Sequence, residues 1–242
     1  KVLFDEDMIK SNRSFAITKL KNNIKTIDSF ISNEEKNLII LTSIGRIFKF
    51  NLSNKFLTPT TKQSQGLKLA KLLPTEKIVS CCSYQNEENN LVILTSIGRI
   101  FKFDLSNKLL TPTSKQSQGL MLAKLLPTEK IVSCCSYRNG EYIYLVSKKG
   151  EIFCIDSNEI YLANEYSLGY INEKTHLKND HFFKILPSNY YLDIETNKNK
   201  SARLTVDKLN YKYNKSSFLI DFLKLDKNEY LENCFRLEKL ID

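Results

Sequence analysis

The stretch NLIILTSIGRIFKF at residues 37–50 returns as NLVILTSIGRIFKF at residues 90–103, and this repetition decides the fold. Segments 38–90 and 91–143 are identical at 44 of 53 aligned positions. Both copies continue through KQSQGL and LAKLLPTEKIVSCCSY, so the repeating unit is a whole supersecondary structure. The sequence therefore predicts a chain built from stacked repeats.

Fainter copies extend the repeat beyond these two units. YLVSKKGEIFCI places Gly150 at the position of Gly45 and Gly98, and NKSARLTV is expected to place Ala202 there. A second mark recurs about every fifty residues, at Ser14, Gly66, Gly119, Gly169 and Ser217. We predict one repeat domain over 1–242, with a partial blade at 1–37 and blades at 38–90, 91–143, 144–189 and 190–242. Because the chain begins inside a repeat, a longer protein is expected.

The apolar pattern within a unit is that of β-strands. Phe48 and Phe50 alternate with Lys49, and Gly45 separates two such runs. Glycine adopts positive φ without strain, which suits a tight hairpin. About four strands in each fifty-residue unit are typical of a blade, and blades bury their faces by stacking radially. We predict an all-β, propeller-like disc whose phenylalanines are core residues. The absence of Trp disfavours a propeller of the WD type, and the presence of only 7 Gly disfavours one of the kelch type.

The positive charge is concentrated in the two near-identical units. The net charge is +9, and segments 38–90 and 91–143 each carry seven Lys or Arg against three acidic residues, so together they hold +8. Such concentration predicts an acidic partner, either nucleic acid or an anionic membrane. A solvated basic surface is the alternative. No apolar run reaches the ~18–20 residues that cross a bilayer, and no basic amphipathic helix favours a membrane surface.

Four of the six cysteines form two adjacent pairs at equivalent positions of the two units, which argues against a disulfide framework. A zinc site would need a CxxC pair or nearby histidines, but His176 and His181 lie in another segment. We predict buried free thiols on strands and a reducing compartment. The cysteines are Cys81, Cys82, Cys134, Cys135, Cys154 and Cys234.

The unit resembles a blade of the C-terminal domain of the DNA gyrase A subunit. Its GRIFKF sequence is similar to that of cyanobacterial and plastid gyrases. The resemblance rests on the GRIFKF hairpin, on Gln65-Gly66-Leu67 with its copy at 118–120, and on LLPTEKIV at 72–79 and 125–132. It implies a β-pinwheel, a disc in which strands are exchanged between neighbouring blades. It also implies DNA wrapping with positive handedness around a basic rim, which lets the ATP-driven holoenzyme introduce negative supercoils. The Arg- and Gly-rich box of gyrases is absent from this sequence, so a relative of the topoisomerase IV type is kept as an alternative.

The same resemblance implies the partners and the absence of catalysis in this chain. The partners would be double-stranded DNA, the remainder of the gyrase A subunit and the gyrase B subunit, with no membrane. The sequence contains no Arg-Tyr pair of the kind that carries the topoisomerase nucleophile, no GxxxxGK[ST] phosphate-binding loop and no GxSxG nucleophile elbow. We therefore expect no catalytic residue, cofactor or metal in this chain. The resemblance implies that ATP and Mg²⁺ act elsewhere in an ATP-dependent type II topoisomerase. The location would be a plastid or apicoplast in a eukaryote, and otherwise the cytoplasm. The competing hypothesis is a propeller-like scaffold that binds an acidic protein.

The candidate DNA-binding residues are cations that recur from unit to unit, because a regular polyanion suits regularly spaced phosphate contacts. Lys55 and Lys108 are expected to be merely solvated, so reversing Arg46 and Arg99 to Glu should cost more DNA affinity than reversing those two lysines. In the third unit Glu151 and Cys154 replace Arg46 and Lys49, so that blade should contact DNA poorly. The predicted set is Arg46, Lys49, Lys62, Lys71, Lys77, Arg99, Lys102, Lys115, Lys124, Lys130 and Arg203.

Overall fold

The structure is a computed structural model of the whole chain. It describes residues 36–53, 55–61, 64–85, 88, 90–106, 111–163, 169–171, 177, 180–187, 191–204 and 225–237, together with positions 2, 18, 20 and 24–30 near the N-terminus.

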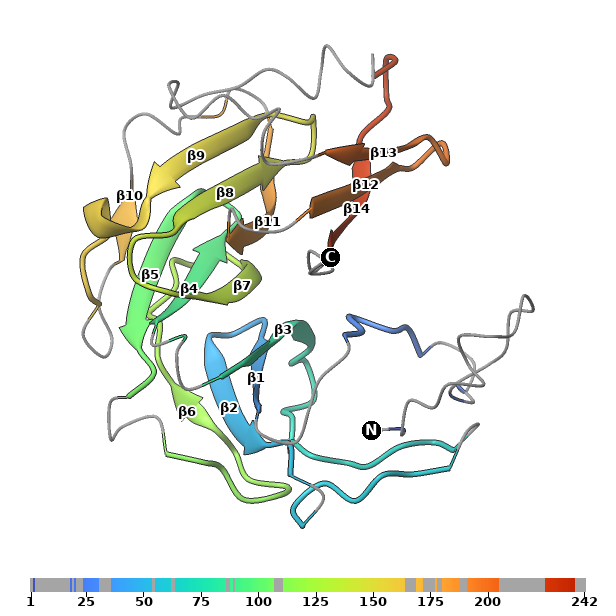
Figure 1. Cartoon of the computed structure of the whole chain (residues 1–242), viewed down its shortest axis with the longest axis vertical. Helices are drawn as coiled ribbons and strands as arrows, with labels where there is room; N and C mark the ends of the chain where they lie inside the picture. Colours follow the sequence, from blue (N-terminus) through green and yellow to red (C-terminus); the bar gives the residue numbers. More distant parts are fainter. Residues whose placement is uncertain are drawn as a thin grey trace, which may run out of the picture.

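Four antiparallel sheets follow one another around an arc in chain order, and we call them blades 1 to 4 (Figure 1). Blade 1 has the order β3 (Ile78–Tyr84), β1 (Asn37–Thr42), β2 (Arg46–Asn51), β6 (Leu120–Met121). Blade 2 has the order β10 (Tyr170–Ile171), β5 (Arg99–Asp104), β4 (Asn90–Thr95), β7 (Ile131–Tyr137). Blade 3 has the order β11 (Phe182–Pro187), β8 (Tyr142–Ser147), β9 (Ile152–Asp156), and blade 4 the order β13 (Ser201–Leu204), β12 (Tyr191–Thr196), β14 (Leu231–Leu237).

The predicted all-β class is confirmed. The part of the chain that the structure describes contains these strands and one short 3₁₀ helix, η1 (Ser157–Glu159). The prediction that Ala202 takes the position of Gly45 in the fourth unit was wrong, because Asn199 takes the positive φ of 60° in the β12–β13 hairpin while Ala202 lies inside β13. Ser14 and Ser217 lie outside the described residues, and the blade boundaries stay a prediction.

Outer strands are exchanged between neighbouring blades, as the pinwheel prediction requires. β6 belongs to the second repeat but pairs with β2 of blade 1, and β10 of the third repeat pairs with β5 of blade 2. Figure 1 shows β6 beside β2. Backbone contacts extend each exchange, since the Thr113 N–H donates to the Lys49 carbonyl at 2.7 Å and the Ala163 N–H to the Lys102 carbonyl at 2.7 Å.

The glycine of the repeated QGL stretch is required by this exchange. A Cβ on Gly119 would lie 2.7 Å from the Ile47 carbonyl oxygen and 2.8 Å from the Phe48 ring, in the blade before it. Gly169 meets the Phe101 ring of its preceding blade in the same way. Both glycines also have positive φ, which a side chain disfavours.

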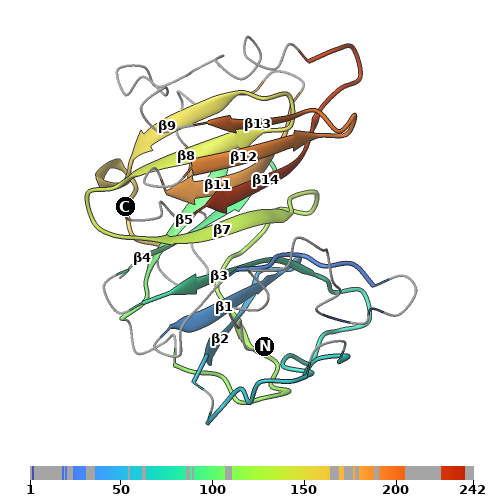
Figure 2. The same ribbon diagram turned by 45° about the vertical axis from the view of Figure 1, so that its right-hand side comes forward.

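The core lies between adjacent sheets. β7 packs against β3 on one side and β11 on the other (Figure 2). One buried cluster joins Ile39 and Leu41 of blade 1 to Leu91 and Phe101 of blade 2. The phenylalanine prediction is confirmed, because Phe48, Phe50, Phe101 and Phe153 are fully buried. The six cysteines are free thiols as predicted, but the prediction that they are buried holds for four of them, because Cys81 and Cys154 are only partly buried.

None of the helices in the described residues is both long enough and apolar enough to cross a membrane.

Candidate nucleic-acid interface

The two arginines of the predicted set that lie in blades 1 and 2 are buried. Arg46 is 7% exposed and Arg99 is 4% exposed. Their guanidinium groups bind carboxylates inside the protein, so the prediction that they lie on an exposed rim is wrong. A buried, paired guanidinium has no face left for a phosphate, because its donors are already satisfied.

Each arginine closes a clip between its hairpin and the turn that precedes the inner strand of its own blade. Arg46 Nε donates to Glu76 Oε1 at 2.8 Å, and Arg46 Nη2 donates to the other oxygen of Glu76 and to the Lys71 carbonyl. Arg46 Nη1 also donates to the carbonyl of Gln118, on the exchanged segment. Arg99 repeats the clip with Glu129, at 2.7 Å from Nε to Oε1, and with the Lys124 carbonyl.

The carboxylates of the clips stay ionised despite burial. Burial by itself raises the pKa of Glu76, but hydrogen bonds from Arg46, Thr42 and the Leu73 N–H outweigh it, and the pKa lies below its usual value. The pKa of Glu129 is lowered against burial by Arg99, the Leu126 N–H and Thr95. Breaking such a pair from one side leaves a buried charge uncompensated, which is costly.

Blade 4 builds the same clip with a lysine. Lys200 occupies the hairpin position of Arg46, and its Nζ lies 2.8 Å from Glu229 Oε2. The hydrogen bond from the Asp226 backbone N–H is the largest cause that lowers the pKa of Glu229, and the hydrogen bond from Lys200 adds to it. The resulting pKa is about 2. Blade 3 has Glu151 and Cys154 at the positions of Arg46 and Lys49, as the sequence predicted.

Lys49 and Lys102 are half-buried and link neighbouring repeats. Lys49 Nζ lies 3.3 Å from the Leu105 carbonyl and 5.5 Å from the centre of the Tyr84 ring. Lys102 makes the equivalent contacts with the Ser157 carbonyl and the Tyr137 ring. Burial lowers the pKa of both lysines. Their ammonium groups therefore point at the protein, which contradicts their assignment to an exposed surface.

Four other predicted residues are exposed and lie on the loops that the clips hold. Lys71 and Lys77 flank the clipped turn of blade 1, and Lys124 and Lys130 flank that of blade 2. We call residues 71–77 and 124–130 the lysine loops. The Ser43 N–H donates to the Lys77 carbonyl at 2.8 Å, and the Ser96 N–H donates to the Lys130 carbonyl at the same distance. The clips and these bonds fix both loops at the hairpin ends of their blades.

The remaining candidates fall into three situations. Lys115 is exposed, with Nζ 5.0 Å from the centre of the Phe56 ring. Arg203 is exposed but forms a two-pronged pair with Asp193, at 2.7 and 2.8 Å, and its register is that of Lys49. Lys62 lies outside the described residues, as does Lys108, whereas Lys55 is exposed as expected.

Sequence reasoning missed the buried glutamates. A signal was present, because Arg46–Glu76 and Arg99–Glu129 recur with the same separation of 30 residues. Repeated cations paired at fixed spacing with repeated acids indicate an internal ion pair as readily as a ligand site. Among the described residues no cluster of His, Cys, Asp or Glu could hold a metal ion.

Comparison with known proteins finds a family match within the two near-identical repeats. The family described as DNA gyrase C-terminal domain, beta-propeller, matches residues 36–81 and 89–134. The A subunit of DNA topoisomerase 4 from Synechocystis sp. (strain ATCC 27184 / PCC 6803 / Kazusa) is 34% identical over 91 residues, which cover 38% of this chain and 10% of that protein. The chain thus aligns with only a small part of this relative.

Solved structures show the same fold. A DNA gyrase A C-terminal domain has a TM-score of 0.65 at 17% identity, covering 84% of this chain and 66% of that one. The C-terminal domain of DNA topoisomerase IV has a TM-score of 0.71 at 16% identity, covering 92% of this chain and 69% of that one. The family match over residues 36–81 and 89–134 confirms the resemblance of the two near-identical repeats to DNA gyrase C-terminal domains, and the solved structures confirm the fold.

Proposed function

We propose that this chain binds double-stranded DNA through its lysine loops and bends the duplex around the disc, as the C-terminal domain of the A subunit of a type IIA DNA topoisomerase. The observation that carries the proposal is the presence of exposed lysines on equivalent, rigidly held loops of two successive blades. The family match of residues 36–81 and 89–134 supports the same function.

The electrostatics of the lysine loops fit a polyanion. Lysine is a compact point charge that needs no particular geometry at a phosphate, so it favours binding without sequence readout. The acidic residue within each loop, Glu76 or Glu129, is buried in its clip, so the loops present their cations outward. Sequence preference would then come from how readily a DNA segment bends.

The finer assignment is also a proposal. As a gyrase-type domain the chain would wrap DNA with positive handedness, so that a holoenzyme containing the remainder of the A subunit and the B subunit introduces negative supercoils. ATP and Mg²⁺ would act in those other parts. The alternative is a topoisomerase IV-type domain. A plastid or apicoplast location stays a prediction.

A binding titration with charge-matched variants tests DNA contact. We expect Lys77→Glu/Lys130→Glu to weaken binding to a duplex of random sequence by at least about tenfold, and to make the slope of log affinity against log salt shallower by about two. Lys55→Glu/Lys227→Glu changes the net charge equally at exposed sites outside the lysine loops. Equal losses in both variants would contradict the proposed contact surface.

Ligation of nicked plasmid in the presence of the chain tests wrapping. A positive change in linking number that grows with protein concentration is expected for gyrase-type wrapping. Binding with no change in linking number would leave a DNA-binding disc without the geometry for supercoiling. No binding at low salt would favour the scaffold that recognises an acidic protein.

A further inference from the structure

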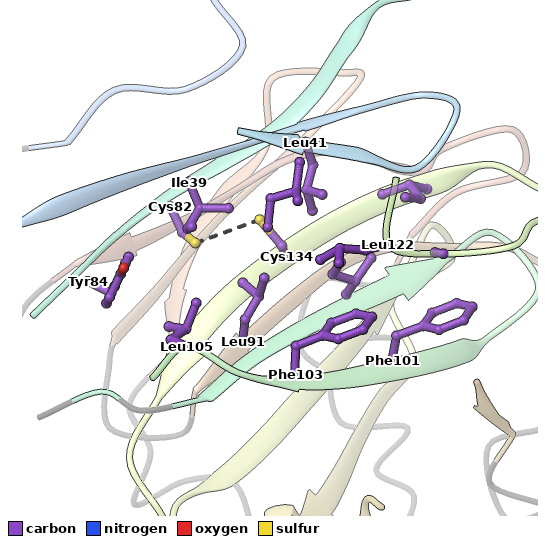
Figure 3. Close-up of a cluster of buried hydrophobic side chains, with 14 residues drawn as sticks. Ile39, Leu41, Cys82, Tyr84, Leu91, Phe101, Phe103, Leu105, Leu122 and Cys134 are labelled. Atoms are coloured by element: carbon purple, nitrogen blue, oxygen red, sulfur yellow. Dashed lines mark hydrogen bonds between the residues drawn. The ribbon is translucent and has the colours of Figure 1, made fainter. Parts of the chain in front are cut away.

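Two cysteines of different blades meet in the core. Cys82 lies on β3 of blade 1 and Cys134 on β7 of blade 2, and their sulfur atoms are 3.7 Å apart (Figure 3). Both side chains are buried. The contact arises from the repeat itself, because the second cysteine of the Cys81-Cys82 pair faces the first cysteine of the Cys134-Cys135 pair.

The surroundings of Cys134 favour its ionised form. The hydrogen bond between the two thiols lowers the pKa of Cys134, with a further contribution from the Ser80 hydroxyl, 3.5 Å from the Cys134 sulfur, although burial opposes both. Burial instead raises the pKa of Cys81 to about 12 and that of Cys154 to about 11. Since the thiolate is the reactive form, Cys134 is the expected nucleophile of this pair.

We propose that Cys82 and Cys134 form a disulfide when the protein meets a peroxide, and that this bond ties blade 1 to blade 2. The sulfurs must approach from 3.7 Å to the bonded distance, which is about 2.0 Å. A movement of this size needs side-chain rotation and a small shift of facing strands. Hydrogen peroxide is small enough to reach a thiol between two sheets during local opening of the interface.

The chemistry balances with one peroxide for each disulfide. The Cys134 thiolate attacks hydrogen peroxide, forming a sulfenic acid and releasing hydroxide, which the proton lost from Cys134 converts to water. The Cys82 sulfur then attacks the sulfenic sulfur, an S–S bond forms, and the oxygen leaves as a second water with the Cys82 proton. Two thiols are oxidised and one peroxide is reduced to two waters.

The other blade interface along this strand cannot form the same bond. β7 packs on its other side against β11, whose sequence FFKILP contains no cysteine. The cross-link is therefore specific to the boundary between the two near-identical repeats. It would restrain blades 1 and 2 relative to each other, and these are the blades that carry the lysine loops.

Peptide mapping after oxidation tests the proposal. The full chain is treated with hydrogen peroxide, unfolded and alkylated, and the number of blocked thiols is counted by mass spectrometry. We expect four alkylated cysteines in place of six, a disulfide-linked peptide pair containing Cys82 and Cys134, and a rise in melting temperature on the order of 5 °C that dithiothreitol reverses.

Matched variants separate this pair from other thiol oxidation. Cys82→Ser and Cys134→Ser should each lose the linked peptide and the rise in melting temperature, whereas Cys154→Ser should keep both. Six free thiols after treatment, or a linked pair between other cysteines, would overturn the proposal. The peptide map of the unchanged chain decides the matter even if a variant does not fold.

Discussion

Blades 2 and 3 have the same hairpin register but opposite charges at the residue that follows the hairpin glycine. Arg99 follows Gly98 in blade 2, and Glu151 follows Gly150 in blade 3. In blade 2 the arginine clips Glu129, two residues before β7. In blade 3 the corresponding residue before β11 is Asp180, which accepts the Lys149 N–H at 3.1 Å.

In blade 3 the hairpin cation is Lys148, which lies before Gly150 instead of after it and contacts a different partner. Lys148 Nζ donates to the Leu231 carbonyl of blade 4 at 2.8 Å and lies 4.5 Å from the centre of the Phe183 ring. The Leu231 N–H in turn donates to the Lys148 carbonyl at 2.8 Å. A hairpin cation can thus lock a blade to itself or join it to the next one, and in either case it serves the fold.

Breaking the clip of blade 2 should have the largest effect on stability. Arg99→Met removes the guanidinium and leaves Glu129 buried without its cation, so we expect a loss of about 3–5 kcal/mol in the free energy of unfolding. Urea unfolding followed by circular dichroism measures it. Arg99→Met/Glu129→Leu removes both charges and should recover most of the loss. A single variant that unfolds like the unchanged chain would show that the clip does not stabilise blade 2.

The exchanged strand that the Arg46 clip holds should be nearly as sensitive. Gly119→Ala introduces a Cβ 2.7 Å from the Ile47 carbonyl at a positive φ, and we expect a loss of about 2–4 kcal/mol. Gly140→Ala is the control, because Gly140 has a φ of 85° but no atom within 4 Å of the added Cβ. Its cost should be limited to about 1–2 kcal/mol of backbone strain. Equal losses in urea unfolding would show that close approach to blade 1 contributes nothing.

The clips should also make the fold sensitive to acid. Folding lowers the pKa values of Glu76, Glu129 and Glu229, so their contribution to stability is complete above the unfolded value of 4.5. It is lost as the pH falls through the folded values, which for Glu229 is about 2. We expect the free energy of unfolding to decrease as the pH is lowered from about 5 towards 2. Glu129→Gln should show a shallower dependence, and an unchanged pH profile would contradict the role of this clip.

The repeated sequence was enough to predict the fold, but it was not enough to predict which of its cations are exposed. The strand class followed from local periodicity, and the exchange of strands followed from the family resemblance. Burial of Arg46 depends on Glu76 and on Gln118, 30 and 72 residues away, and no local pattern reports such contacts. Regular cations therefore looked equivalent in the sequence, although four of the predicted set are internal and four lie on the lysine loops.

The fourth unit shows a second limit of reading repeats by their glycines. Asn199 takes the hairpin position of Gly45, since asparagine tolerates positive φ better than other residues with side chains. A search for a small residue selected Ala202 three positions later and shifted the register of Arg203. Hydrogen bonding between β12 and β13, which pairs Asp193 with Arg203, corrects it.

The smallest effect is expected at an exposed ion pair in the blade 4 hairpin. Lys198 Nζ lies 3.2 Å from Asp226 Oδ2, but the side chains are 44% and 60% exposed, so Lys198→Ala should cost less than about 1 kcal/mol in urea unfolding. Added salt should remove even that difference, because water and ions screen exposed charges. The Arg99→Met loss should persist in salt, since the Arg99–Glu129 pair is buried. A salt-resistant loss at Lys198 as large as that at Arg99 would mean that burial does not separate the two kinds of hairpin cation.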